Sequence, residues 1–267
     1  MSNVFPMHRM TGTDSFNAPR QYGDIKRNGD NDHIIANAAP RIPWDVFYDR
    51  FDWKQGEHVG LIGPTGQGKT NLLMNLLPIR TYVAVFATKP RDPSMDRLMA
   101  SGYYRMDKWE SLDPRKTPKR VVWPNATHID AEDTQREVFD DAFKAIYKET
   151  GWCIDLDEGY YISQTLGLQK RMRTIWTQGR SLGISFVVST QRPKWVPLEM
   201  YDQSTHLFFW RENDDDNLRR IAGMGAAPSV LIREIVSNLD PFQCLYVNTR
   251  NGSMMRTRAP APLNDSQ

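Results

Sequence analysis

Seven short apolar runs recur along the chain, and within each run the apolar positions are nearly continuous. The runs are Val59–Ile62, Tyr82–Ala87, Val121–Trp123, Trp152–Leu156, Ile184–Ser189, Leu207–Trp210 and Cys244–Val247. Continuous runs of this length are typical of strands that are buried on both faces of a parallel sheet. The pattern therefore predicts a central sheet with both faces covered.

Amphipathic stretches lie between several of these runs and are predicted to be helices. They are Gly68–Leu77, Ala131–Thr150, Ser163–Arg180 and Asp214–Ala222. In the second, Val138, Ala142 and Ile146 fall on one apolar stripe, and Asp130 can cap its start. In the last, Asn213 is the expected N-cap. Alternating strands and helices predict an α/β fold with a mostly parallel central sheet that helices cover on both faces.

The polar pattern divides the chain into three parts. Residues 1–40 are polar, rich in Asn, Asp, Gly and Arg, and without periodicity, so we interpret them as a flexible N-terminal arm. Such an arm could dock on a neighbouring subunit or could be a free tail. Residues 41–250 carry the predicted strands and form the expected domain. Residues 251–267 form a C-terminal tail with one short strand and a Pro-rich end.

Composition narrows the class of protein only a little. Hydrophobic residues make up 40% of the chain, enough for a full core, and 34 basic against 32 acidic residues give a net charge of +2. This balance neither requires nor excludes nucleic acid. The two cysteines are not in a CxxC pair, and the five histidines lack the spacing of zinc ligands. No segment reaches the roughly 20 apolar residues that span a membrane, so a soluble cytoplasmic protein is expected.

The first apolar run leads into a phosphate-binding motif of the form GxxxxGK[ST]. Its residues are Gly63, Pro64, Thr65, Gly66, Gln67, Gly68, Lys69 and Thr70. Glycines allow backbone N–H groups to turn inward around phosphate oxygens, and the helix that follows points its positive end at the anion. Lys69 is expected to reach the β- and γ-phosphates, and the Thr70 hydroxyl to bind Mg²⁺.

Two acids end the fourth apolar run and complete the expected hydrolytic site. Asp157 is placed to hold Mg²⁺, and Glu158 can polarise the attacking water. Asp155 competes for the metal role, but only Asp157 is followed directly by Glu. A solvated strand end would explain such a pair on its own; beside a phosphate loop it indicates a metal-dependent hydrolase.

The fifth apolar run ends in a polar segment that contains Gln191. Its amide could hydrogen-bond both the γ-phosphate and the water and so report whether the nucleotide is intact. Alternatively, the segment is an ordinary polar turn stopped by Pro193.

Three segments together resemble the HerA–FtsK superfamily of DNA-pumping ATPases: GPTGQGKT, CIDLDE and GRSLGISFVVSTQRP. The likeness extends over about residues 53–210. It implies a RecA-like core with an extra strand between the phosphate-loop strand and the acid-bearing strand, with ATP and Mg²⁺ as ligands and Gln191 as the sensor. It also implies a pentameric or hexameric ring in which an arginine reaches the neighbour's γ-phosphate. Arg180 is the first choice for this finger, with Arg173 and Arg192 behind it; a helix C-terminal charge is the alternative for Arg180.

The sequence departs from the cellular members by lacking a membrane anchor, a long linker and a DNA-reading domain. The resemblance therefore favours the viral genome-packaging branch, with double-stranded DNA and a capsid portal as partners and the host cytoplasm as location. A DNA transfer or segregation pump, a P-loop switch with little DNA contact, and a nucleotide kinase are the alternatives. The kinase is disfavoured because it needs no water-activating Glu.

Two basic clusters could contact DNA phosphates. One consists of Lys170, Arg171 and Arg173, and the other consists of Arg115, Lys116, Lys119 and Arg120. The first cluster is preferred because it lies on the helix that follows the two acids. For each of these residues a solvated face is the alternative.

Overall fold

A nine-stranded sheet forms the centre of the protein. The computed structural model describes residues 31–125, 127–128, 131–191, 193, 197–224 and 227–261. Within these ranges the strand order is β3-β4-β2-β5-β6-β1-β7-β8-β9. The strands are β1 His58–Ile62, β2 Val83–Phe86, β3 Tyr104–Met106, β4 Lys119–Val122, β5 Cys153–Leu156, β6 Ser185–Thr190, β7 Ser204–Trp210, β8 Cys244–Asn248 and β9 Met254–Thr257.

The pairing of the strands confirms a mostly parallel sheet. Strands β1 to β7 are joined in parallel, whereas β8 runs antiparallel to β7 and β9 antiparallel to β8. All seven predicted strands are present, and β6 lies between β1 and β5, as the resemblance implied. The sequence pattern missed β3, a three-residue strand with two exposed positions at the edge of the sheet.

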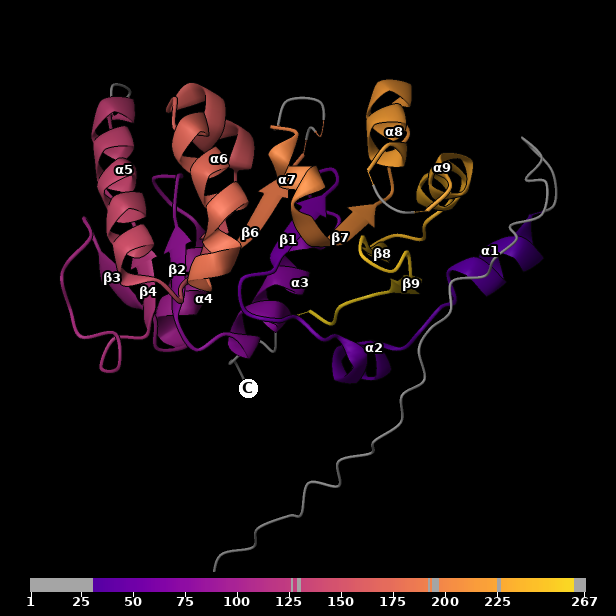
Figure 1. Ribbon diagram of the computed structural model, residues 1–267, viewed down its shortest axis with the longest axis horizontal. Coiled ribbons are helices and arrows are strands. Elements are labelled where there is room, and N and C mark those ends of the chain that lie inside the picture. The colour runs from indigo at the N-terminus through magenta and orange to yellow at the C-terminus, as the bar shows by residue number, and fades with distance from the viewer. Residues whose placement is uncertain are drawn as a thin grey trace, which may run out of the picture.

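Helices cover both faces of the sheet (Figure 1). The helices are α1 Asp32–Ala38, α2 Trp44–Arg50, α3 Lys69–Leu76, α4 Pro93–Ala100, α5 Glu132–Glu149, α6 Gln169–Gln178, α7 Glu199–Asp202, α8 Asp215–Ala222 and α9 Ser229–Ser237. Helices α2, α3 and α4 pack their apolar side chains on one face, and α1, α5, α6, α7, α8 and α9 pack on the other. Each face thereby has its own apolar core.

Two predicted helix boundaries are wrong. The single helix expected from residue 163 is divided: a short π-helix covers Tyr161–Thr165 and α6 begins at Gln169, because Gly167 between them has a φ of +66°. Helix α8 is capped by Asp214, whose side chain accepts a hydrogen bond from the Asn217 N–H, one residue later than predicted. The proposed cap Asp130 lies outside the described residues.

The ends of the described chain belong to the fold. Helix α1 occupies residues that were expected to end a flexible arm, and its Ile35 and Ala38 are buried in the core. Burial of apolar side chains explains why this segment is ordered. Residues 1–30 lie outside the described residues. Strand β9 is the short strand expected after position 250, and the division into arm, domain and tail remains a prediction.

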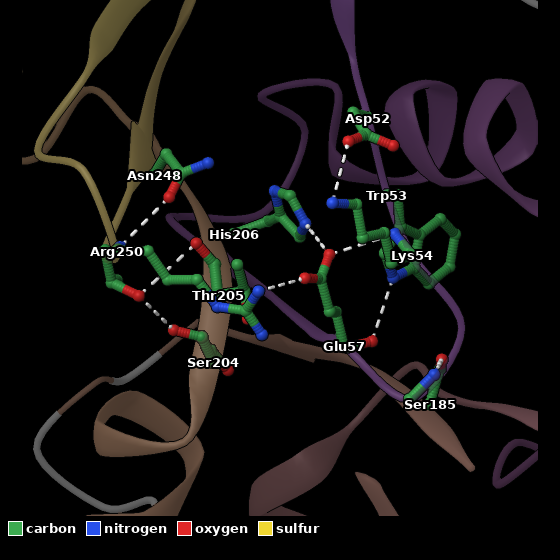
Figure 2. Close-up of polar contacts among 12 residues, drawn as sticks. Asp52, Trp53, Lys54, Glu57, Ser185, Ser204, Thr205, His206, Asn248 and Arg250 are labelled. Carbon is green, nitrogen blue, oxygen red and sulfur yellow. Dashed lines mark hydrogen bonds and ion pairs between the residues drawn. The ribbon is translucent and has the colours of Figure 1, made fainter. Parts of the chain in front are cut away.

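A buried polar cluster ties the amino-terminal edge of β1 to the hairpin of β8 and β9 (Figure 2). The carboxylate of Glu57, only 5% exposed, lies 3.0 Å from His206 Nε2 and 2.7 Å from an Arg250 guanidinium nitrogen. It also accepts the Lys54 N–H, while His206 Nδ1 lies 2.9 Å from the Tyr246 hydroxyl. These contacts fit a neutral His206 that accepts from Tyr246 and donates to Glu57, with Arg250 as the counter-charge.

The neighbours of Glu57, which are Lys54, His206 and Arg250, form the Glu57 cluster with it and set the charge state of its carboxyl group. Burial raises the Glu57 pKa, but the hydrogen bonds from His206 and Lys54 and the positive charge of Arg250 outweigh it and lower the pKa to about 2. Burial lowers the pKa of His206, which agrees with its neutral form. Glu57 therefore remains ionised inside the protein across the physiological range.

Replacing Glu57 with alanine is expected to lower the free energy of unfolding by about 3 kcal/mol, because it leaves Arg250 and His206 without their acceptor. The group has its pKa lowered by folding, so its contribution is present above pH 4.5 and is lost as the pH falls toward 2. Urea unfolding at pH 7 and at pH 3 measures both effects. The control is Asp52→Ala, since Asp52 is 76% exposed. Equal losses for the two variants would contradict this role.

Candidate nucleotide-binding site

The sheet order gathers the predicted site at one edge. Strands β1, β6 and β5 are neighbours and parallel, so their carboxyl ends place the phosphate loop, Gln191 and the two acids side by side. The loop between β1 and α3 depends on glycine at two positions. A Cβ on Gly63 would lie 2.6 Å from the Trp210 Cβ, and Gly68 has a φ of +99°.

A cleft of about 280 Å³ opens over this edge. It is lined by Thr65, Gly66, Gly68, Lys69, Thr70, Asn71, Lys89, Asp92, Ser94, Asp157, Glu158, Gln191 and Phe242. The structure therefore brings together Lys69, Thr70, Asp157, Glu158 and Gln191, which the sequence had predicted from separate segments. It adds five side chains that were not predicted, from Asn71, Lys89, Asp92, Ser94 and Phe242.

The Lys69 ammonium group lies inside the loop. Its Nζ donates to the Gly63 and Pro64 carbonyl oxygens at 2.6 and 2.7 Å. Burial lowers the Lys69 pKa to about 8, against the opposing negative charges of Glu158 and Asp157. An ammonium group that is largely stripped of water gains strongly from an anion beside it, so the loop is suited to a phosphate group.

Lys89 occupies the acidic side of the cleft. Its Nζ lies 3.0 Å from Asp157 Oδ2 and 3.7 Å from Asp92 Oδ2. Burial alone would lower the pKa of Lys89. The negative charges of Asp157 and Asp92 outweigh this effect, so the pKa is raised above its usual value. A cation already sits on Asp157, which shows that this carboxylate suits a positive ion. One sequence signal could have identified Lys89: it lies two residues after the apolar run Tyr82–Ala87, the run that becomes β2 beside β5.

A hydrogen-bonded chain links the phosphate loop to Glu158. The Thr65 hydroxyl donates to Gln191 Oε1 at 2.7 Å, and Gln191 Nε2 donates to Glu158 Oε1 at 2.8 Å. Burial, and next the charge of Asp157, raise the Glu158 pKa above its usual value. A carboxylate with a raised pKa is a better proton acceptor, and Gln191 is held between it and the loop.

Asp155 does not share this site. It is fully buried in β5, does not line the cleft, and its carboxyl oxygens have no hydrogen-bond partner among the described residues. Burial, and next the charge of Asp157, raise its pKa well above the usual value. Asp157 and Thr70 both line the cleft, whereas Asp155 does not, which favours Asp157 for the metal role; that role stays a prediction. A hydroxyl and a carboxylate form a donor set that fits Mg²⁺ completed by phosphate oxygens and water.

The candidate arginine finger lies far from this cleft. The Arg180 carbonyl packs against Gly56, which precedes β1, so Arg180 is at the edge of the sheet opposite the phosphate loop. Within one chain Arg180 therefore cannot act on the site, and a role toward a neighbouring subunit stays a prediction. Arg173 forms an ion pair with Glu199 at 2.6 Å, and Arg192 lies outside the described residues.

The basic clusters differ in their availability to DNA. Lys170 is exposed, and Arg171 Nε lies 2.5 Å from Asp140 Oδ1; the DNA role of Lys170, Arg171 and Arg173 stays a prediction. In the second cluster, the prediction that Arg120 could contact DNA is wrong. Its side chain is fully buried, lies over the Trp109 and Trp152 rings, and donates to backbone carbonyls. The partners of the Arg120 guanidinium are therefore aromatic rings and backbone carbonyls of the protein, and not the DNA phosphates that the run of basic residues suggested.

The topology defines a RecA-like P-loop NTPase fold, since the loop lies between β1 and α3 and β6 separates β1 from the acid-bearing strand. Among the described helices, none has the length and apolar character to cross a bilayer. No protein-family model and no curated protein sequence matches the chain.

Solved structures share this fold. The genome packaging NTPase B204 from Sulfolobus turreted icosahedral virus 2, in complex with sulfate, has a TM-score of 0.60 at 15% identity, over 78% of this chain and 98% of that chain. Its complex with AMPPCP has a TM-score of 0.58 at 18% identity, over 78% and 98%. EssC (ATPases 2 and 3) from Geobacillus thermodenitrificans has a TM-score of 0.50 at 13% identity, over 81% and 42%. The likeness confirms the resemblance seen in the motifs at the level of the fold.

Proposed function

We propose that the protein is an ATP-driven double-stranded DNA translocase of the HerA–FtsK superfamily, and that it packages a viral genome as a ring. The observation that carries the proposal is the convergence of Lys69, Asp157 and Glu158 on one cleft. The overlap with nearly the full length of a viral genome packaging NTPase supports the packaging role.

The predicted site residues in the cleft each have a part in hydrolysis under this proposal. Lys69 and the loop N–H groups bind the phosphates, and Thr70 and Asp157 hold Mg²⁺. The bound metal neutralises charge on the phosphate oxygens. Glu158 accepts a proton from the attacking water, and Gln191, which already contacts Glu158 and Thr65, orients that water. For Asp157 to hold Mg²⁺, its ion pair with Lys89 would have to open.

The position of Arg180 supports a ring if this arginine is the finger. An arginine at the sheet edge opposite the cleft can serve catalysis only if another copy presents its cleft to that edge. Repeating this contact head to tail gives a ring when the rotation between copies closes on itself. A pentamer and a hexamer both satisfy the requirement, and a capsid portal is the partner that a packaging ring requires.

ATPase assays with and without duplex DNA test the function. Stimulation of at least fivefold by duplexes of unrelated sequence is expected, together with loss of stimulation at high salt because backbone phosphates are the contact. Turnover that DNA leaves unchanged, but that a protein partner alters, would favour the conformational switch. Phosphoryl transfer to an added acceptor would favour the kinase, and both results would overturn the translocase.

A further inference from the structure

A second cavity adjoins the phosphate site. It has a volume of about 310 Å³ and is lined by Trp44, Asn71, Phe242, Arg258, Ala259, Pro260 and Ala261. Asn71 and Phe242 also line the phosphate cleft, so the two spaces are adjacent and share a wall. Asn71 directly follows Thr70, the last residue of the phosphate motif. The cavity therefore begins where the phosphate loop ends.

The antiparallel strands bring the walls of this cavity to the loop. Strand β8 begins at Cys244, opposite Trp210 at the end of β7, and Thr257 at the end of β9 pairs with Cys244. The residues before β8 and after β9 therefore lie at the same edge as the phosphate loop. The Asn75 side chain on α3 also donates to the Pro260 carbonyl at 3.3 Å, which fixes the cavity wall beside the loop helix.

Phe242 holds a backbone conformation that its side chain disfavours. Its φ is +63°, in a turn that the Gln243 N–H closes on the Asp240 carbonyl at 3.0 Å. Pro241 takes the second position of this turn, and the third position, with positive φ, is one that glycine normally fills. Strain of this kind persists where the side chain has a task. The Phe242 ring is also 43% exposed, although an aromatic ring gains free energy from burial.

The Phe242 ring faces the start of the loop helix. It lies 3.7 Å from the position that a Cβ on Gly68 would occupy, and the Arg258 guanidinium carbon is 5.1 Å from its centroid. An exposed ring at the end of a phosphate site, beside an apolar space, matches the needs of a flat heterocycle joined to phosphates. Every nucleobase has a face that stacks on an aromatic ring.

We propose that this cavity binds the nucleobase of the triphosphate and that Phe242 is its stacking partner. The inference rests on the proposed function, because the phosphates must lie in the neighbouring cleft. Among the described residues that line the cavity, the polar side chains are those of Asn71 and Arg258. Stacking, with few hydrogen-bonding groups, makes the site tolerant of different purines.

Binding of Mg²⁺-ATP and of Mg²⁺-tripolyphosphate, measured by calorimetry, tests the assignment. Phe242→Gly removes the ring and suits the positive φ, so this variant is expected to fold with an unchanged or higher melting temperature. Its Kd for ATP is expected to rise about tenfold, the loss of one stacked base, while its Kd for tripolyphosphate stays within twofold. Phe242→Trp is expected to retain ATP affinity.

The other outcomes separate this inference from the proposed function. If Phe242→Gly weakens both ligands equally, or neither, the nucleobase assignment is overturned while phosphate binding stands. If the unmodified protein binds neither ligand, the proposed function fails and takes the inference with it. Tyr104→Ala is the matched control, because Tyr104 is an equally exposed aromatic residue (45%) on the distant strand β3.

Discussion

Replacing Glu158 with glutamine is expected to slow ATP hydrolysis by a factor of about 10²–10⁴ and to leave the Kd for Mg²⁺-ATP within about threefold. Glutamine has the same shape and keeps an oxygen that can accept the Gln191 Nε2 hydrogen bond, so the cleft retains its form. It has no carboxylate to take a proton from water. Steady-state phosphate release and equilibrium nucleotide binding measure the two quantities separately.

Asp155→Asn provides the matched control for Glu158. This neighbouring acid is buried in β5, lies outside the cleft, and has its pKa raised by burial. Its replacement is expected to change turnover by less than about threefold, since asparagine has nearly the same shape and the side chain does not reach the cleft. Near-normal hydrolysis by the Glu158→Gln variant would remove Glu158 from its role, whatever the control shows.

Replacing Lys69 with methionine is expected to weaken ATP binding by about 100-fold or more. The variant keeps the length of the side chain but loses the ammonium group that the loop carbonyls hold in place. A charge-assisted hydrogen bond contributes about 1.5–3 kcal/mol, and Lys69 is expected to make bonds to two phosphate groups. Calorimetric titration with Mg²⁺-ATP measures the loss.

The lowered pKa of Lys69 adds a pH dependence to this experiment. Because the pKa of Lys69 in the ligand-free protein is about 8, its ammonium group loses its proton as the pH rises through that value. The ATP affinity of the unmodified protein is expected to fall between pH 7 and pH 9, and the Lys69→Met variant should lack this trend. Lys54→Met is the control, since Lys54 is 67% exposed and outside the cleft. A pH profile shared by all three proteins would exclude Lys69 as its source.

The parts of the site that lie on contiguous residues were predictable from sequence. The phosphate loop is one uninterrupted motif, and Asp157 and Glu158 directly follow an apolar run, so local pattern was sufficient. Gln191 was also found because it ends a strand. Parallel strands all present their carboxyl ends at one edge, which is why these separate predictions met in one cleft.

The residues that were missed depend on strand order and direction. Phe242 reaches the cleft, and Arg258 the adjoining cavity, because β8 runs antiparallel to its neighbours β7 and β9, and the apolar pattern does not distinguish strand directions. Glu57 and His206 are 149 residues apart, so no local pattern links them. The burial of Arg120 could not be predicted, because its position in a run of basic residues does not indicate that it lies over two tryptophan rings.

The Glu57 cluster has a mechanical consequence for a motor. It fastens the turn between β8 and β9 to the segment that enters β1, while the far end of the same hairpin carries Phe242. The proposed base site and the phosphate loop would thus belong to one rigid unit, made of β1 and the hairpin of β8 and β9. Under the proposed function, motion driven by hydrolysis is then expected to begin at Glu158 and Gln191. Hydrogen exchange with and without nucleotide would locate it, and equal changes in both halves would refute the division.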